Sequence, residues 1–141
     1  MIAGIGIDLC EVARIRRALE GPTGRRFRAR VFTAAEAQYC DARGAARFES
    51  FAARFAAKEA AMKVFGTGWG EGVGWLDIEV GATAGRAPAL RLYGEAARLA
   101  SARRLTRWHL SLAHTRGSAI ACVLAETAPR RTAGRPGRRR A

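Results

Sequence analysis

Hydrophobic and polar positions along the chain repeat with two different periods, one typical of strands and one typical of helices. Isoleucines in residues 2–7 stand between small residues, which favours a buried first strand. Four later runs have strand-like patterns, with a turn joining the last two: residues 75–80, 89–92, 108–114 and 118–124. These runs predict two hairpins.

Helical spacing is clearest over residues 47–65, where large apolar residues recur among alanines, the best helix formers. Three shorter helices are expected over about residues 11–19, from residue 33 toward residue 40, and over residues 94–103. Together the two patterns predict an α+β fold, in which a small antiparallel sheet packs against a long helix and shorter helices.

The chain has 141 residues, the size of one domain. We expect residues 1–127 to form it and residues 128–141, rich in Arg, Gly and Pro, to be a disordered tail. No apolar run is long enough to cross a bilayer, and the N-terminus does not resemble a signal peptide. Three widely spaced cysteines fit a reducing compartment, so we expect a cytoplasmic protein without a membrane association.

Charge adds a second constraint, because the net formal charge is +13. Six of the arginines follow residue 127, so the body of the protein carries +7. Such a body should attract an acidic partner, which could be nucleic acid, a phosphorylated small molecule or an acidic protein. The chain lacks the aromatic motif of an RNA-recognition domain, which makes nucleic acid the least favoured of the three.

The chain has only two lysines, and Lys58 and Lys63 flank Glu59 in the long predicted helix. Glu59 and Lys63 are four residues apart and share a helix face. A surface ion pair worth about 0.3–0.5 kcal/mol is the simplest interpretation of that spacing. The alternative is a polyphosphate site, because the glycine-rich segment 66–74 follows and its backbone amides could approach phosphate closely. This segment matches neither a P-loop nor a dinucleotide-binding motif.

Asp8 also has two interpretations. In Asp8-Leu-Cys-Glu11 it has the spacing of a helix capping box, as Thr33 has in Thr33-Ala-Ala-Glu36. Alternatively, Asp8 and Glu59 could supply the one or two carboxylates that Mg²⁺ usually takes from a protein.

The two histidines, His109 and His114, fall on opposite faces of a regular strand because they are five residues apart. We favour His114 for function, since it stands at the end of its predicted strand. A serine hydrolase built on Ser111 is disfavoured because no nucleophile-elbow sequence surrounds it.

Several motifs, in this order and spacing, resemble those of the holo-acyl-carrier-protein synthases, the small stand-alone 4′-phosphopantetheinyl transferases. They are Gly4-Ile-Gly-Ile-Asp8, Glu11-Val-Ala-Arg-Ile15, Phe32-Thr-Ala-Ala-Glu36, Arg54-Phe-Ala-Ala-Lys-Glu-Ala-Ala-Met-Lys63, Gly66-Thr-Gly68, Asp77-Ile-Glu79 and His109-Leu-Ser-Leu-Ala-His114. The resemblance spans residues 1–126. It implies the fold of that family and transfer of 4′-phosphopantetheine from coenzyme A to a serine of apo acyl carrier protein, with release of adenosine 3′,5′-bisphosphate.

The resemblance also implies roles for individual residues. Asp8 and Glu59 match the family's magnesium ligands, and Glu59 would act as general base, directly or through a metal-bound water. Lys63 matches a lysine that contacts the pyrophosphate and assists the leaving group. Lys58 would help with a coenzyme phosphate or with positioning.

Other matches concern the coenzyme and the partners. The remaining residues implied in coenzyme binding are Gly66, Gly68, Arg86, Pro88, His114 and Thr115. The basic edge formed by Arg14, Arg17, Arg25 and Arg28 is the expected docking surface for the acidic carrier. The resemblance further implies a homotrimer with active sites between subunits. Whether the carrier serves fatty-acid or polyketide synthesis is left open by these residues.

Overall fold

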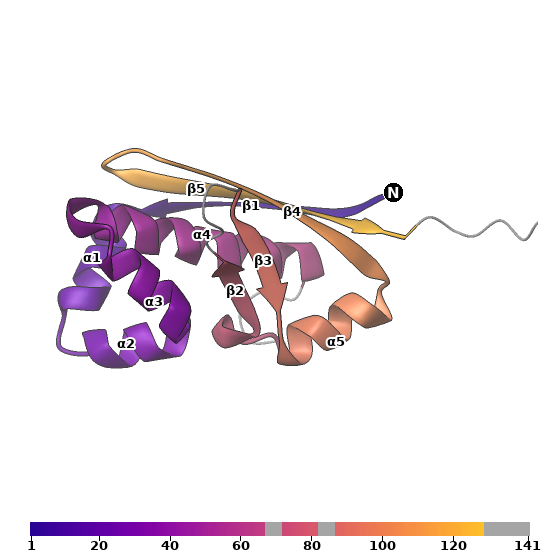
Figure 1. The fold of residues 1–141 in the computed structure, drawn as a ribbon, viewed down its shortest axis with the longest axis horizontal. Helices are drawn as coiled ribbons and strands as arrows, with labels where there is room; N and C mark the ends of the chain where they lie inside the picture. The colour runs from indigo at the N-terminus through magenta and orange to yellow at the C-terminus, as the bar shows by residue number, and fades with distance from the viewer. Residues whose placement is uncertain (67–71, 82–86, 129–141) are drawn as a thin grey trace, which may run out of the picture.

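A long helix lies across one face of a three-stranded sheet, and shorter helices and a hairpin cover its other sides (Figure 1). The computed structural model describes residues 1–66, 72–81 and 87–128. The elements are β1 (Ile2–Glu11), α1 (Val12–Glu20), α2 (Gly24–Val31), α3 (Ala34–Asp41), α4 (Arg47–Phe65), β2 (Ile78–Gly81), β3 (Ala89–Leu92), α5 (Gly94–Ala102), β4 (Leu105–His114) and β5 (Ser118–Thr127), with short 3-10 turns at Gly44–Ala46 and Trp75–Asp77. The predicted α+β fold is confirmed.

The main sheet has the strand order β1-β5-β4 and is antiparallel throughout. Its inner face packs on α4 through small side chains, because Ala119, Ala121 and Ala125 are all fully buried. Glycine extends this close approach to β1, since a Cβ atom on Gly6 would lie only 1.9 Å from the carbonyl oxygen of Ala60. Asp8 has the same parity as Gly6 on β1, so the strand carries its carboxylate toward α4.

The expectation of a buried first strand was wrong for its isoleucines. Ile5, Ile7 and Leu9 are each more than half exposed, on the face of the sheet turned away from α4. Helix α4 comes so close at Gly4 and Gly6 that a larger side chain would not fit at these two positions of β1. The strand alternation therefore places the small residues inside and the branched residues outside.

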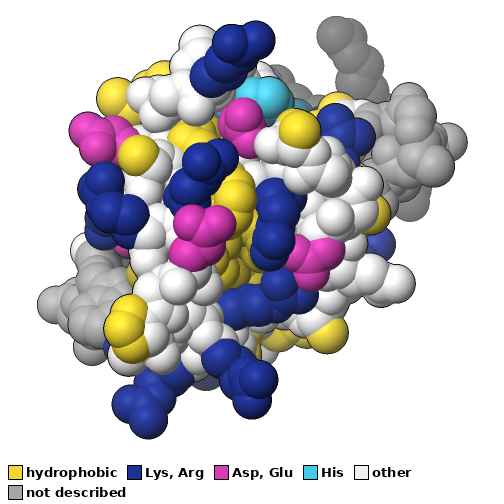
Figure 2. All heavy atoms as spheres, turned by 90° about the vertical axis from the view of Figure 1, so that its left-hand side faces the viewer, with side chains coloured by type: hydrophobic (Ala, Val, Ile, Leu, Met, Phe, Trp, Pro, Cys, Tyr) yellow, Lys and Arg dark blue, Asp and Glu magenta, His cyan; other side chains and the backbone are white. Residues whose placement is uncertain are grey.

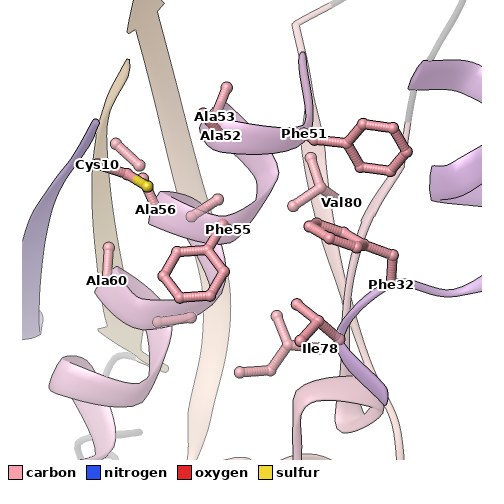
Figure 3. Close-up of a cluster of buried hydrophobic side chains, with 14 of the residues drawn as sticks. Cys10, Phe32, Phe51, Ala52, Ala53, Phe55, Ala56, Ala60, Ile78 and Val80 are labelled. Carbon is pink, nitrogen blue, oxygen red and sulfur yellow. The ribbon is translucent and has the colours of Figure 1, made fainter. Parts of the chain in front are cut away.

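The hydrophobic core is centred on α4, whose alanines allow neighbouring elements to approach and whose phenylalanines fill the space between them. Figure 3 shows Phe51 and Phe55 of α4 beside Phe32, with Ile78 and Val80 of β2 on the same side of the helix as Phe32. Phe51 is completely buried, and its ring meets that of Phe32 edge to face at 4.8 Å between centroids. This packing joins the short hairpin β2–β3 to the long helix.

Most predicted elements are present, but three details differ. Helix α2 was not predicted, and residues 75–77 form a 3-10 turn that precedes β2. The capping box of Thr33 and Glu36 is confirmed at the start of α3. The one proposed for Asp8 is wrong, because Asp8 lies within β1 and Glu11 precedes α1 without a side-chain capping bond. The predicted tail lies outside the described residues except for position 128, and no helix of the described ranges has the length and apolar character needed to span a membrane.

Candidate active site

The centre of the candidate site is formed where β1 crosses the C-terminal half of α4. The ammonium nitrogen of Lys63 donates to Asp8 Oδ1 at 3.0 Å and to the carbonyl oxygen of Ile7 at 2.6 Å. Half of the Lys63 side chain is exposed, compared with 18% of the Asp8 side chain. Two residues separated by 55 positions in the sequence thus meet at the surface. The anticipated ion pair between Lys63 and Glu59 gives way here to one with Asp8.

Glu59 belongs to the same electrostatic environment. Burial raises the pKa of its carboxyl group above the ordinary value, and the negative charge of Asp8 raises it further. Lys63 and Arg14 oppose that shift. A cation bound at this centre would favour the ionised form of Glu59.

The two acids suit magnesium in number and chemistry. Mg²⁺ prefers hard oxygen ligands and usually takes one or two carboxylates, with water and substrate phosphate completing its shell. Among the residues the structure describes, no group of three or more His, Cys, Asp and Glu side chains could hold a metal by itself. Asp8 and Glu59 therefore fit an ion that is shared with a phosphorylated substrate.

A pocket of about 320 Å³ opens beside Glu59. The other residues that line it are Arg14, Phe27, Arg30, Val31, Phe55 and Trp75. The rings of Phe55 and Trp75 stack with their centroids 4.8 Å apart, and the Arg14 guanidinium lies 5.4 Å from the Phe55 ring. The pocket thus combines aromatic walls with positive charge next to the acids.

Except for Arg14, none of these other lining residues was anticipated as a site residue. Phe27, Arg30 and Val31 belong to α2, a helix missing from the prediction. Arginine is a good helix former, and Phe27 and Val31 are spaced four apart, so the signal for this helix was present in the sequence.

Lys58 does not fit its predicted contact with a coenzyme phosphate. Its side chain is fully buried on another side of α4, where it pairs with the buried carboxylate of Glu36 at 2.8 Å. Burial lowers the pKa of Lys58, while the Glu36 carboxylate opposes the shift. Of the two roles considered for Lys58, the structure supports positioning.

The residues expected to bind coenzyme are only partly brought together. Gly66 has φ +66° and ends α4 in the left-handed conformation that favours glycine. Pro88 is half-buried and precedes β3. Gly68 and Arg86 lie outside the described residues.

His114 and Thr115 line a separate hollow of about 200 Å³, which they share with Leu9 and Ile120. The side chains of Leu9 and Ile120 are exposed on the outer face of the sheet. Within a single chain this hollow and the Asp8–Glu59 centre therefore lie on opposite faces of the sheet. The other histidine, His109, bonds through Nε2 to Glu126 Oε1 at 2.6 Å.

The predicted docking arginines belong to α1 and α2; three of them line two different pockets, and Arg17 is exposed on α1. Arg14 lines the Glu59 pocket, whereas Arg25 and Arg28 line a larger pocket of about 800 Å³ that also includes residues of α3. Arg28 is paired with Asp41. Figure 2 shows this end of the molecule, where basic side chains surround a hydrophobic hollow.

The fold and the paired acids beside a basic pocket define a small α+β transferase, and the comparisons identify its family. The family model described as the 4′-phosphopantetheinyl transferase superfamily matches residues 4–123, so the chain belongs to this superfamily. A holo-[acyl-carrier-protein] synthase of Anaeromyxobacter dehalogenans is 53% identical over 130 residues, which cover 91% of this chain and 98% of that protein.

Solved structures agree with this assignment. The holo-[acyl-carrier-protein] synthase of Neisseria meningitidis is 32% identical with a TM-score of 0.78, covering 90% of this chain and 100% of that one. The enzyme of Bacillus anthracis, in complex with CoA (3′,5′-ADP), is 36% identical with a TM-score of 0.73, covering 91% and 99%. The chain is thus an enzyme of the holo-[acyl-carrier-protein] synthase group, as its motifs predicted.

Proposed function

We propose that this enzyme transfers 4′-phosphopantetheine from coenzyme A to a serine of apo acyl carrier protein in a magnesium-dependent reaction that releases adenosine 3′,5′-bisphosphate. The observation that carries the proposal is the convergence of Asp8 and Glu59 beside the pocket that Arg14 and Phe55 line. The relatives support the substrates, because one is described with CoA (3′,5′-ADP) and another, from Helicobacter pylori, with coenzyme A.

In this reaction the serine oxygen attacks the phosphorus that carries the pantetheine arm. The new P–O bond forms as the bond to the adenosine bisphosphate breaks, and the serine proton goes to a base. Glu59 is our candidate for that base, directly or through a water molecule, because its carboxylate lines the pocket and lies in the same electrostatic environment as Asp8 and Lys63.

Asp8 and Glu59 would hold the magnesium ion. When bound there, the ion would offset negative charge on the pyrophosphate of the coenzyme. Lys63 has three donor hydrogens, of which Ile7 and Asp8 use two, so one is available to the leaving pyrophosphate oxygen.

A homotrimer with active sites between subunits would explain why the site residues are divided. His114 and Thr115, proposed to bind nucleotide phosphates, share a hollow on the outer face of the sheet with apolar side chains. Ile5 and Ile7 continue this exposed apolar surface, and a neighbouring copy would bury it. His114 of one subunit would then serve the Asp8–Glu59 centre of another, with Gly66, Gly68, Arg86 and Pro88 as further coenzyme contacts.

The carrier protein would dock on the basic end that Arg14, Arg17, Arg25 and Arg28 form. Acidic carriers would be steered to it by complementary charge, with an affinity that falls as salt rises. We place the reaction in the cytoplasm, in keeping with three unpaired cysteines.

The test is mass spectrometry of apo carrier protein incubated with coenzyme A and magnesium. Glu59→Ala and Asp8→Ala should each lower the rate of mass gain by about 100-fold or more, since each removes a charged group from the reacting centre. The melting temperature should change little, because both residues are partly exposed. Glu95→Ala, which alters a partly exposed acid paired with Arg98, is the matched control and should keep full activity. Undiminished transfer by either site variant would refute the site assignment.

A further inference from the structure

The buried ammonium group of Lys58 makes three short contacts, each with a different part of the fold. Its nitrogen donates to the carbonyl oxygen of Val31 at 2.7 Å and to that of Trp75 at 2.9 Å. The third contact is with Glu36 Oε2 at 2.8 Å. A protonated lysine has three hydrogens to donate, so every donor of Lys58 is used inside the protein.

Glu36 is held equally firmly on the other side of the ion pair. Its Oε2 also accepts a hydrogen bond from the backbone nitrogen of Thr33 at 2.9 Å, and its Oε1 accepts one from that of Val80 at 2.7 Å. The carboxylate therefore joins the start of α3 to β2 without help from Lys58. Glu36 thus connects the backbone of Thr33 to that of Val80, whereas Lys58 connects Val31 and Trp75 to α4.

The two carbonyl groups bound by Lys58 belong to walls of the Glu59 pocket. Val31 ends α2, Trp75 begins the 3-10 turn before β2, and both line the pocket. A further wall comes from α4 itself, through Phe55, which stacks on Trp75, and Glu59. Lys58 immediately precedes Glu59 on that helix, so a single side chain ties the two outer walls to the helix that carries the proposed base.

We propose that Lys58 is a positioning residue that sets the width of the substrate pocket by holding the backbone of Val31 and Trp75 against α4. This inference rests on the proposed role of the Glu59 pocket. Lysine suits the task because its compact ammonium group presents donors in several directions, whereas methionine has a similar length and donates nothing.

If this ion pair served stability alone, breaking it from the Lys58 side or from the Glu36 side would have the same effect on the pocket. Lys58→Met removes the ion pair together with both carbonyl contacts. Glu36→Gln breaks the same ion pair but leaves a lysine amine that still reaches Val31 and Trp75. The two variants therefore separate loss of stability from loss of the pocket walls.

The experiment combines steady-state kinetics with the fluorescence of Trp75 as the single tryptophan, in a Trp69→Phe, Trp108→Phe background. Both variants should lose about 10–20 °C in melting temperature, so all assays are run at least 10 °C below the lower transition. Only Lys58→Met should shift the Trp75 emission to longer wavelength and raise KM for apo carrier protein about 10-fold, with kcat changed less. Glu36→Gln should keep both values within about twofold of the background protein.

The exposed pair of Glu95 and Arg98 provides the control, and Arg98→Met should change neither reading. If Lys58→Met does not fold, Lys58→Gln replaces it, because its amide ends one bond short of the ammonium position and cannot reach all three oxygens. Equal KM changes in the Lys58 and Glu36 variants, or an unchanged KM in the Lys58 variant, would overturn the proposal. Retained activity of Glu59→Ala would instead contradict the function proposed for the pocket, while the Trp75 emission would still report on the wall.

Discussion

The two lysines of α4 make similar ion pairs in opposite surroundings. Lys58 meets Glu36 at 2.8 Å with both side chains fully buried, whereas Lys63 meets Asp8 at 3.0 Å with half of the lysine exposed. Five residues rotate a helix by about 500°, which leaves the two side chains about 140° apart. Lys58 therefore points toward α3 and β2, and Lys63 points toward β1.

This difference in surroundings gives the two lysines different roles, one structural and one chemical. Breaking a buried pair leaves a charge that water cannot reach, so Lys58 contributes to the stability and shape of the fold. An exposed pair is weak and can be exchanged for another partner, so Lys63 and Asp8 are available to a ligand. The same residue type in one motif thus has two roles, and burial decides between them.

The largest effect should be on stability, and it should appear at only one of the lysines. Lys58→Met is expected to lower the free energy of unfolding by about 3–5 kcal/mol, because it leaves Glu36 buried without its partner. Lys63→Met should lower it by about 1 kcal/mol or less. Urea unfolding followed by circular dichroism measures both. Similar losses at the two positions would remove the distinction drawn between them.

A smaller effect, on turnover, should appear at the other lysine. Lys63→Arg keeps the positive charge but replaces the compact ammonium by a larger planar group beside Asp8, so we expect kcat to fall about 10-fold, equivalent to about 1.4 kcal/mol. The unfolding transition should hardly move. Arg98→Lys, at an exposed position, is the matched exchange and should keep full turnover. If Lys63→Arg is equally active, then the scarcity of lysine in this chain reflects composition rather than chemistry.

The smallest effect concerns the pH dependence of stability near Asp8. Glu59 has a raised pKa in the folded protein, so ionisation disfavours folding and stability is lost as the pH rises through that pKa. Glu59→Gln removes this loss and should raise the melting temperature by about 1–3 °C at pH 7 in the presence of a chelator. The gain should vanish at a pH below the ordinary carboxyl value of 4.5, where Glu59 is protonated in both states. A gain that persists at acid pH would show that charge is not its cause.

Local patterns predicted much of the fold. The capping box of Thr33 and Glu36, the helix over residues 47–65 and both hairpins are present because each depends on neighbours in the sequence. Helix α2 was not predicted because its only large apolar residues, Phe27 and Val31, stand among several arginines. The capping box at Asp8 failed because strand pairing with β5 continues as far as Glu11 and overrides a local signal.

The sequence predicted which residues belong to the candidate site better than it predicted which of them contact one another. Asp8, Glu59 and Lys63 were chosen by motif and chemistry, and the structure brings them together. The partner of Lys63 was not predictable, because a spacing of four residues favours Glu59 and only the crossing of β1 over α4 supplies Asp8. The pocket walls at Val31 and Trp75 also come from distant segments.

By itself, the sequence determined the family, the α+β class and the residues able to carry phosphoryl-transfer chemistry, since these follow from residue types and short-range spacing. Only the tertiary structure decided which face of β1 lies against α4 and which lysine is buried. Both outcomes depend on contacts between distant segments. Gly6 allows α4 to pack closely on the sheet, and α3 and β2 pack around Lys58 and exclude water from it. Interactions between segments distant in sequence therefore bury Lys58 inside the fold and leave Lys63 exposed at the candidate active site.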